Sequence, residues 1–77
     1  MSEGVSFGAL LRQYRRAAGL SQEALAEQAG ISIDGVAALE RGRRTAPRAS
    51  TVSLLATALG LDADQRTTFI AAALGSS

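Results

Sequence analysis

The residues of this 77-residue chain with the clearest chemistry are its arginines, which account for every basic residue. Four of them, Arg41, Arg43, Arg44 and Arg48, fall within eight positions, and no acid follows Glu40 until Asp62. A guanidinium group stays charged at any physiological pH and presents a planar fork of donors that fits phosphate oxygens. Because the net charge is only +1, this cluster is a local positive patch on a nearly neutral chain. The cluster predicts an anion-binding surface, and the alternative is an ordinary solvated basic loop.

The residues that several other kinds of chemistry require are absent from the sequence. The sequence contains no histidine and no cysteine, so a disulfide framework, a thiolate zinc site and most nucleophile-plus-imidazole catalysis are excluded. The serines and acids are accounted for as helix caps and surface residues, so we expect no enzyme, no metal and no cofactor. No apolar stretch approaches the ~20 residues that cross a bilayer, and the N-terminus lacks a signal-peptide pattern. We therefore expect a cytoplasmic chain with no membrane or small-molecule partner.

Serines and glycines mark the limits of three predicted helices in the first half of the chain. Each helix begins after a capping serine and ends at a glycine, and the three pairs are Ser6 and Gly19, Ser21 and Gly30, and Ser32 and Gly42. Apolar residues recur at helical spacing within each helix. The predicted inward residues are Phe7, Leu11, Tyr14 and Ala18, then Leu25, Ala26 and Ala29, then Val36 and Leu39.

Two further helices are predicted after the loop that ends at Pro47. The fourth starts at about Arg48 or Ala49 and stops at Gly60, and the fifth is capped by Asp62, with Gln65 completing a capping box. The predicted inward residues are Val52, Leu55, Ala56 and Leu59, then Phe69, Ile70 and Ala73. Alanine and leucine dominate the composition, which favours helix. We expect one all-α domain over 1–77, a compact five-helix bundle with an ordered core of about 6–74.

The connection between the second and third predicted helices is very short. It consists of Gly30, Ile31 and Ser32, and a three-residue turn with glycine between short helices is typical of a helix-turn-helix. Ala26 leaves room for a close helix crossing, and Gly30 can adopt a positive φ. Val36 and Leu39 can anchor the third helix to the core. The sequence therefore predicts a helix-turn-helix at about 22–41.

Three segments of the chain carry a resemblance to a known family. "LRQYRRAAGLSQEALAEQAGIS", "ALERGRR" and "TVSLLATALGL", with the spacing between them, resemble the Cro and phage-repressor type of helix-turn-helix domain, also called the xenobiotic-response-element family. The resemblance extends from about Phe7 to Ala73. It implies a lambda-repressor-like bundle that binds double-stranded DNA in transcriptional control, and thus a cytoplasmic protein associated with the nucleoid.

The resemblance also implies roles for individual residues. Gln22, in the first turn of the second helix, matches a glutamine that family members place on a DNA phosphate, and the alternative is a plain solvent-facing residue. Arg15 and Glu40 match an internal salt bridge between the first and third helices. Related domains meet the sugar-phosphate backbone at the positions of Arg41, Arg43 and Arg44. Related domains reach toward the minor groove from the position that Arg48 occupies here. Arg48 could equally be an ordinary basic residue.

The base-reading positions implied by the resemblance carry little that could read a base. They correspond to Ile33, Asp34, Ala37 and Ala38, and none of these is the Arg, Lys, Gln or Asn that hydrogen-bonds purine edges. Two kinds of base contact remain open to these residues. Their apolar side chains can contact thymine methyl groups, and Asp34 can accept a hydrogen bond from a cytosine amino group. Asp34 would also face phosphates, which repel it. Because the helix lacks side chains that hydrogen-bond purine edges, it predicts modest sequence preference.

Two functions therefore remain open. In the first, the chain is the DNA-binding domain of a transcriptional regulator and holds duplex DNA mainly by arginine–phosphate contacts, with the third helix in the major groove. In the second, it is a protein-interaction module whose small, smooth third helix packs on a partner. A second copy could pair through Leu61 and the fifth helix, although these apolar residues could simply close the core. The chain could also be the N-terminal part of a longer regulator.

Overall fold

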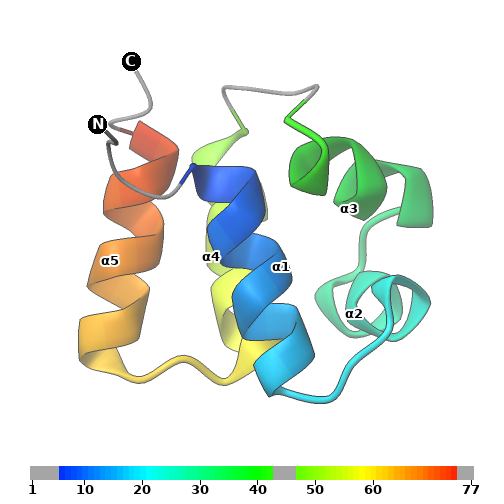
Figure 1. The fold of residues 1–77 in the computed structure, drawn as a ribbon, viewed down its shortest axis with the longest axis horizontal. Coiled ribbons are helices and arrows are strands. Elements are labelled where there is room, and N and C mark those ends of the chain that lie inside the picture. The colour runs from blue at the N-terminus through cyan, green and yellow to red at the C-terminus, as the bar shows by residue number, and fades with distance from the viewer. Residues whose placement is uncertain (1–5, 43–46, 75–77) are drawn as a thin grey trace.

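Five α-helices make up the part of the chain that the computed structural model describes, residues 6–42 and 47–74. They are α1 (Phe7–Ala17), α2 (Gln22–Ala29), α3 (Ile33–Glu40), α4 (Ala49–Leu59) and α5 (Ala63–Leu74). In Figure 1, α1, α4 and α5 form one part of the bundle, and α2 and α3 lie together at the other end. The predicted all-α five-helix bundle is confirmed. No helix in the described ranges is long and apolar enough to cross a membrane.

The capping residues chosen from the sequence begin the helices as predicted. The hydroxyl oxygens of Ser6, Ser21 and Ser32 accept hydrogen bonds from the backbone N–H three residues later, at 3.2, 3.0 and 2.9 Å. The capping box at the start of α5 is also formed, since Gln65 N–H donates to Asp62 Oδ1 at 2.8 Å and Asp62 N–H donates to Gln65 Oε1 at 3.1 Å. These bonds satisfy backbone donors that helix starts leave free.

The turn between α2 and α3 is closed by a left-handed residue. Gly30 has φ 75° and ψ 30°, a conformation that costs glycine little, and the N–H of Ile31 donates back to the carbonyl oxygen of Ala26 at 3.0 Å. The chain can therefore leave α2 and begin α3 at Ser32 within three residues. The two helices pack against each other as a helix-turn-helix.

One core joins all five helices. Its largest fully buried side chains are Phe69, Leu11, Leu25, Leu55 and Val36. The rings of Phe7 and Phe69 have centroids 4.8 Å apart, so that the start of α1 is held against α5. Apolar surface removed from water supplies most of the driving force for such a small bundle.

Two of the predicted inward residues are placed outward by the structure. Ala18 is exposed because it lies beyond the last helical residue of α1, at the C-cap, where no other helix covers it. Ile70 retains 37% of its accessible surface, although its neighbour Phe69 is fully buried. The core of α5 is a narrow stripe through Phe69 and Ala73, and Ile70 lies at its edge.

Candidate nucleic-acid interface

An ion pair ties α1 to the end of α3. Arg15 Nε donates to Glu40 Oε2 at 2.5 Å, Arg15 Nη2 donates to Glu40 Oε1 at 3.1 Å, and Nη1 donates to the carbonyl oxygen of Leu20 at 2.9 Å. The side chains are only 11% and 4% exposed. A planar guanidinium that meets both carboxylate oxygens is the strongest arrangement such a pair can adopt. The structure thus contains the internal bridge that the resemblance implies, and Arg15 is used within the fold.

The environment of Glu40 favours its charged form. Burial by itself raises the pKa of this carboxyl, but hydrogen bonds from Arg15 and Gln22, with the positive charges of Arg15 and Arg12, outweigh burial and lower it. The hydrogen bond to Glu40 raises the pKa of the Arg15 guanidinium, although burial opposes this. Glu40 is therefore ionised at neutral pH in the folded chain.

Gln22 is the third member of this network. Its Nε2 donates to Glu40 Oε1 at 3.1 Å, so that the first residue of α2 is bonded to the last residue of α3. Sequence reasoning placed Gln22 on a phosphate and did not foresee this bond, because nothing in the local spacing connects positions 22 and 40. An amide nitrogen carries two hydrogens, so one remains for a further acceptor. The network joins the start of α2 to the end of α3, and the end of α3 to α1.

The four predicted base-facing residues lie on the outer side of α3. Ile33 and Asp34 are exposed, and Ala37 and Ala38 are partly exposed, while Val36 and Leu39 are buried beneath them. Ile33 retains 46% of its accessible surface, which is high for an isoleucine. This outer side is therefore small, mostly apolar and acidic at its start.

Two arginines of the predicted phosphate-binding cluster, Arg41 and Arg48, lie within the described residues. Arg41 is the exposed C-cap of α3, and Arg43 and Arg44 lie outside the described residues. Arg48 is exposed and precedes α4, where it lines a cleft of about 390 Å³ with residues from the start of α3. The cleft residues are Ile31, Ser32, Gly35, Leu39, Pro47, Arg48 and Thr51. Described basic residues thus follow the end of α3 and border its start.

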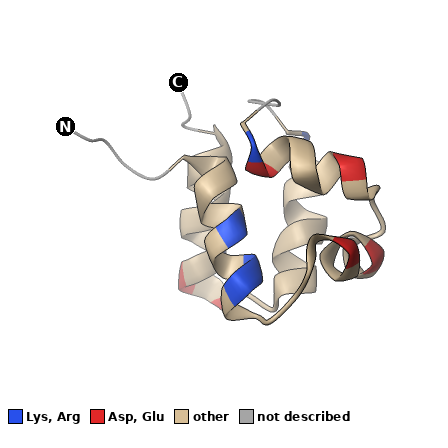
Figure 2. Ribbon diagram, turned by 45° about the vertical axis from the view of Figure 1, so that its right-hand side comes forward, with Lys and Arg blue, Asp and Glu red and all other residues tan. Residues whose placement is uncertain are grey.

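Charge is divided unevenly over the bundle (Figure 2). Basic positions on α1 face the same side as α3, while the acidic positions of α2 lie on the side of that helix away from α1.

The Arg15–Glu40 bridge is the single ion pair among the residues that the structure describes. Arg12 and Arg16, also on α1, were given no role by the sequence analysis. Among the described residues, no group of three His, Cys, Asp or Glu side chains is placed to hold a metal ion.

The apolar residues after α4 divide into two groups. Leu61 packs against the core, and Phe69 and Ala73 are buried, as expected of residues that close the bundle. Ile70 and Leu74 are exposed, and Leu74 retains 78% of its accessible surface. Both border an apolar groove of about 140 Å³ between α4 and α5, which is lined by Pro47, Ala49, Val52, Ser53, Ile70, Ala73 and Leu74.

Comparison with known proteins agrees with this geometry. The family described as "Helix-turn-helix domain" matches residues 6–69. A crystal structure of the clp gene regulator ClgR from C. glutamicum is similar to this chain, with a TM-score of 0.74 and 28% sequence identity, and the match covers 96% of this chain and 95% of that one. No curated protein gave a significant match. With most of its length matched by the family and its fold shared with a gene regulator, this chain belongs to the helix-turn-helix domain family.

Proposed function

We propose that the chain is the DNA-binding domain of a transcriptional regulator, with α3 in the major groove and arginine–phosphate contacts supplying most of the affinity. Family membership and the similarity to a gene regulator support DNA binding in transcription regulation. The observation that carries the finer proposal is that exposed Arg41 caps the end of α3 while exposed Arg48, at the N-cap of α4, lines a cleft shared with residues of α3. Such a protein would work in the cytoplasm, at the nucleoid.

The proposed phosphate contacts come from two kinds of group. Arg41, Arg43, Arg44 and Arg48 supply guanidinium forks, and the last of these would also reach toward the minor groove from the residue before α4. Gln22 supplies its second amide hydrogen at the start of α2, where the helix dipole favours an anion. Its bond to Glu40 would hold the amide in place before DNA arrives, which reduces the ordering cost of binding.

Affinity for duplex DNA is expected to fall steeply with salt. If about four phosphates are neutralised by Arg41, Arg43, Arg44 and Arg48, the plot of log K against log salt should have a slope of roughly −3.6. The chain in which Arg43, Arg44 and Arg48 are replaced by alanine should show a clearly flatter slope. Fluorescence anisotropy with a labelled random-sequence duplex measures both slopes, and equal slopes would contradict the phosphate assignment.

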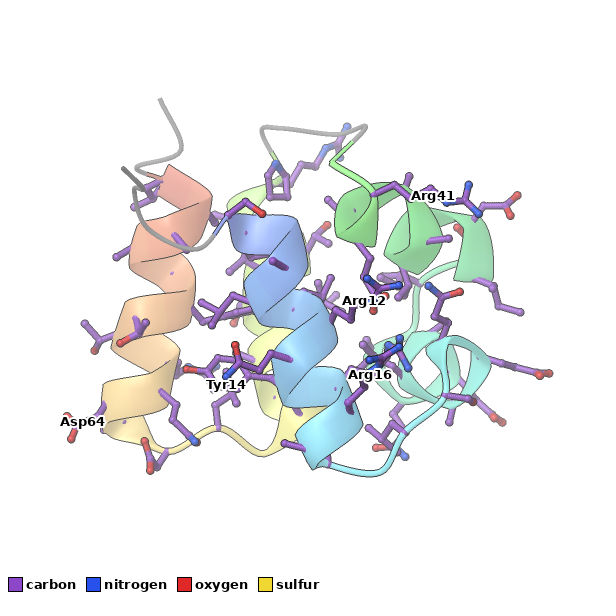
Figure 3. All side chains as sticks on the ribbon, in the orientation of Figure 1. Arg12, Tyr14, Arg16, Arg41 and Asp64 are labelled. Carbon is purple, nitrogen blue, oxygen red and sulfur yellow. The ribbon has the colours of Figure 1, made fainter. Side chains whose placement is uncertain are left out.

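Replacing Asp34 by asparagine is expected to raise affinity for DNA by roughly fivefold, because a like charge near a phosphate costs about 1 kcal/mol in water. Asp34 lies in the first turn of α3. Asp64, in the first turn of α5 and far from α3 in Figure 3, provides a matched control. Asp64→Asn removes the same charge from the same helical position and should leave the dissociation constant unchanged. An equal gain in both variants would indicate a net-charge effect only.

A protein-interaction module is the second candidate function, because the exposed Ile33 gives the outer side of α3 an apolar character. Asp34→Asn separates the two functions, since it should not improve DNA affinity if α3 faces a protein. Selection of bound sites from random duplexes would also separate them. We expect a weak motif dominated by A/T-rich shape, because the outer side of α3 lacks hydrogen-bonding residues for purine edges.

Pairing with a second copy and membership of a longer regulator remain part of the proposal. Leu61 is partly buried against the core and Phe69 is fully buried, which favours their role in closing the core. If α5 takes part in pairing, exposed Ile70 and Leu74 are the residues that would do so.

A further inference from the structure

We propose that Arg12 and Arg16 of α1 form a second phosphate-binding site, which contacts the DNA strand on the far side of the groove from Arg48. The proposal rests on the proposed function, since it assumes a duplex lying along α3. It assigns a role to two arginines that neither the family match nor the resemblance uses.

Arg12 and Arg16 are one helical turn apart on the same face of α1. Residues four apart in an α-helix lie about 6 Å from each other along its axis and project in nearly the same direction. In Figure 3 both side chains extend from α1 toward the side occupied by α2 and α3. They flank Arg15, whose guanidinium is turned inward to Glu40.

Both side chains are free to meet a ligand. Arg12 and Arg16 are exposed, whereas Arg15 is nearly buried. The ion pair of Arg15 with Glu40 is the single salt bridge among the described residues, so no described acid neutralises either arginine. The positive charge of Arg12 is nonetheless close enough to act on Glu40 at the end of α3. The site therefore adjoins the helix-turn-helix.

The geometry of the major groove indicates which part of DNA would be contacted. A helix in this groove, which is about 12 Å wide, has one phosphate strand on each side. Arg48 lies beside the start of α4 and would meet one strand. The opposite side of α3 is bounded by α1 and by the start of α2, with Gln22 bonded to Glu40 between them. Arg12 and Arg16 supply charge on that side, where neither α2 nor α3 contributes a described basic residue before Arg41.

The test is the salt dependence of DNA binding by the full chain carrying Arg12→Ala and Arg16→Ala together. Each phosphate contact contributes about 0.9 to the slope, so the two added contacts would bring the slope of the unaltered chain from roughly −3.6 to roughly −5.4, and the double variant should return to roughly −3.6. Arg12→Lys with Arg16→Lys keeps both charges and should retain the original slope. The probe is a labelled duplex of random sequence, and circular dichroism verifies that each variant is folded.

Arg66→Ala serves as the control for lost charge remote from the site. Arg66 lies on α5, at the opposite end of the bundle from α3 in Figure 1, and donates to Ser53 and Thr57 of α4. Its replacement should leave the slope unchanged. If the Arg12/Arg16 double alanine variant also keeps the full slope while replacement of Arg43, Arg44 and Arg48 flattens it, the second site is refuted and the proposed function stands. If the unaltered chain binds no duplex, both are refuted.

Discussion

Replacing Gly8 by alanine is expected to destabilise the domain by about 3 kcal/mol, and thus to lower its Tm by roughly 15 °C. Gly8 is buried in α1, and a Cβ at this position would lie 2.4 Å from the carbonyl oxygen of Leu39 and 2.9 Å from that of Glu40. Both atoms belong to the backbone at the end of α3, so rotation of a side chain cannot relieve the overlap. The two helices would have to move apart.

Gly35→Ala is the matched control for this experiment, because Gly35 is also a glycine within a helix. A Cβ there would lie 3.1 Å from the hydroxyl oxygen of Ser32, which caps α3 by accepting from the Gly35 N–H and would have to shift by only a few tenths of an ångström. The change should be neutral or should stabilise the domain by up to about 1 kcal/mol, since alanine favours helix over glycine by that amount. Thermal unfolding followed by circular dichroism measures both. If Gly8→Ala were as stable as Gly35→Ala, the close approach of α1 to α3 would be contradicted.

The loss of stability in Gly8→Ala has a consequence for the candidate interface. Glu40, whose carbonyl oxygen Gly8 approaches, also carries the carboxylate that accepts hydrogen bonds from Arg15 and Gln22. A displaced end of α3 would weaken this network and change the position of α3 relative to α2. We therefore expect DNA affinity to fall at temperatures where Gly8→Ala is still folded.

The second large effect is expected from Arg15→Met, which should destabilise the domain by about 3 kcal/mol at neutral pH. The change leaves the carboxylate of Glu40 nearly buried, with Gln22 as its remaining hydrogen-bond donor. An uncompensated buried charge costs more than the pair itself contributes. Arg16→Met is the matched control, because Arg16 is exposed and such surface changes usually stay within about 0.5 kcal/mol.

The pH dependence of Arg15→Met has a definite sign. In the unaltered chain the pKa of Glu40 is lowered, so its contribution to stability is present above the ordinary glutamate pKa of about 4.3 and is lost as the pH falls through the lower folded value. In the variant the hydrogen bonds and charge of Arg15 are absent while burial remains, so the pKa of Glu40 rises. Protonation then relieves the buried charge.

The difference in unfolding free energy between Arg15→Met and the unaltered chain should therefore shrink as the pH is lowered from 7 toward about 4. Urea denaturation at several pH values measures it. The double variant Arg15→Met with Glu40→Leu removes both charges and should recover most of the lost stability at pH 7. A difference that stays constant with pH would mean that Arg15 stabilises the fold by packing alone.

Helix starts and ends were predictable from the sequence because the interactions that set them are local. Ser21, Ser32 and the pair of Asp62 and Gln65 bond to backbone groups three residues away, and these bonds depend only on the order of residues. Gly30 ends α2 for an equally local reason, its positive φ. The family resemblance rests on the same short-range pattern, which is why the fold and the helix-turn-helix were foreseen.

The candidate site was less predictable, because its contacts join residues far apart in the chain. No local pattern connects Gln22 to Glu40, and the bond exists because α2 and α3 pack against each other with the start of α2 beside the end of α3. The exposure of residues at the edges of a buried helical stripe could not be predicted from the sequence either. A period of 3.6 residues identifies the middle of a buried stripe, whereas its edges depend on which neighbouring helix covers them. Ile70 is an example, since Phe69 is fully buried against the rings of Phe7 and Tyr14 of α1, whereas its neighbour Ile70 retains 37% of its accessible surface.

By itself, the sequence determined five helices, a short turn between the second and third, and a cluster of arginines near a helix with few polar residues. Only the tertiary structure decided which arginines remain free to bind. Arg15 and Arg16 are adjacent in the chain, but the 100° between successive helical residues turns Arg15 toward Glu40 and leaves Arg16 exposed. Charge is a property of the residue, but its availability for binding depends on the helices that pack around it.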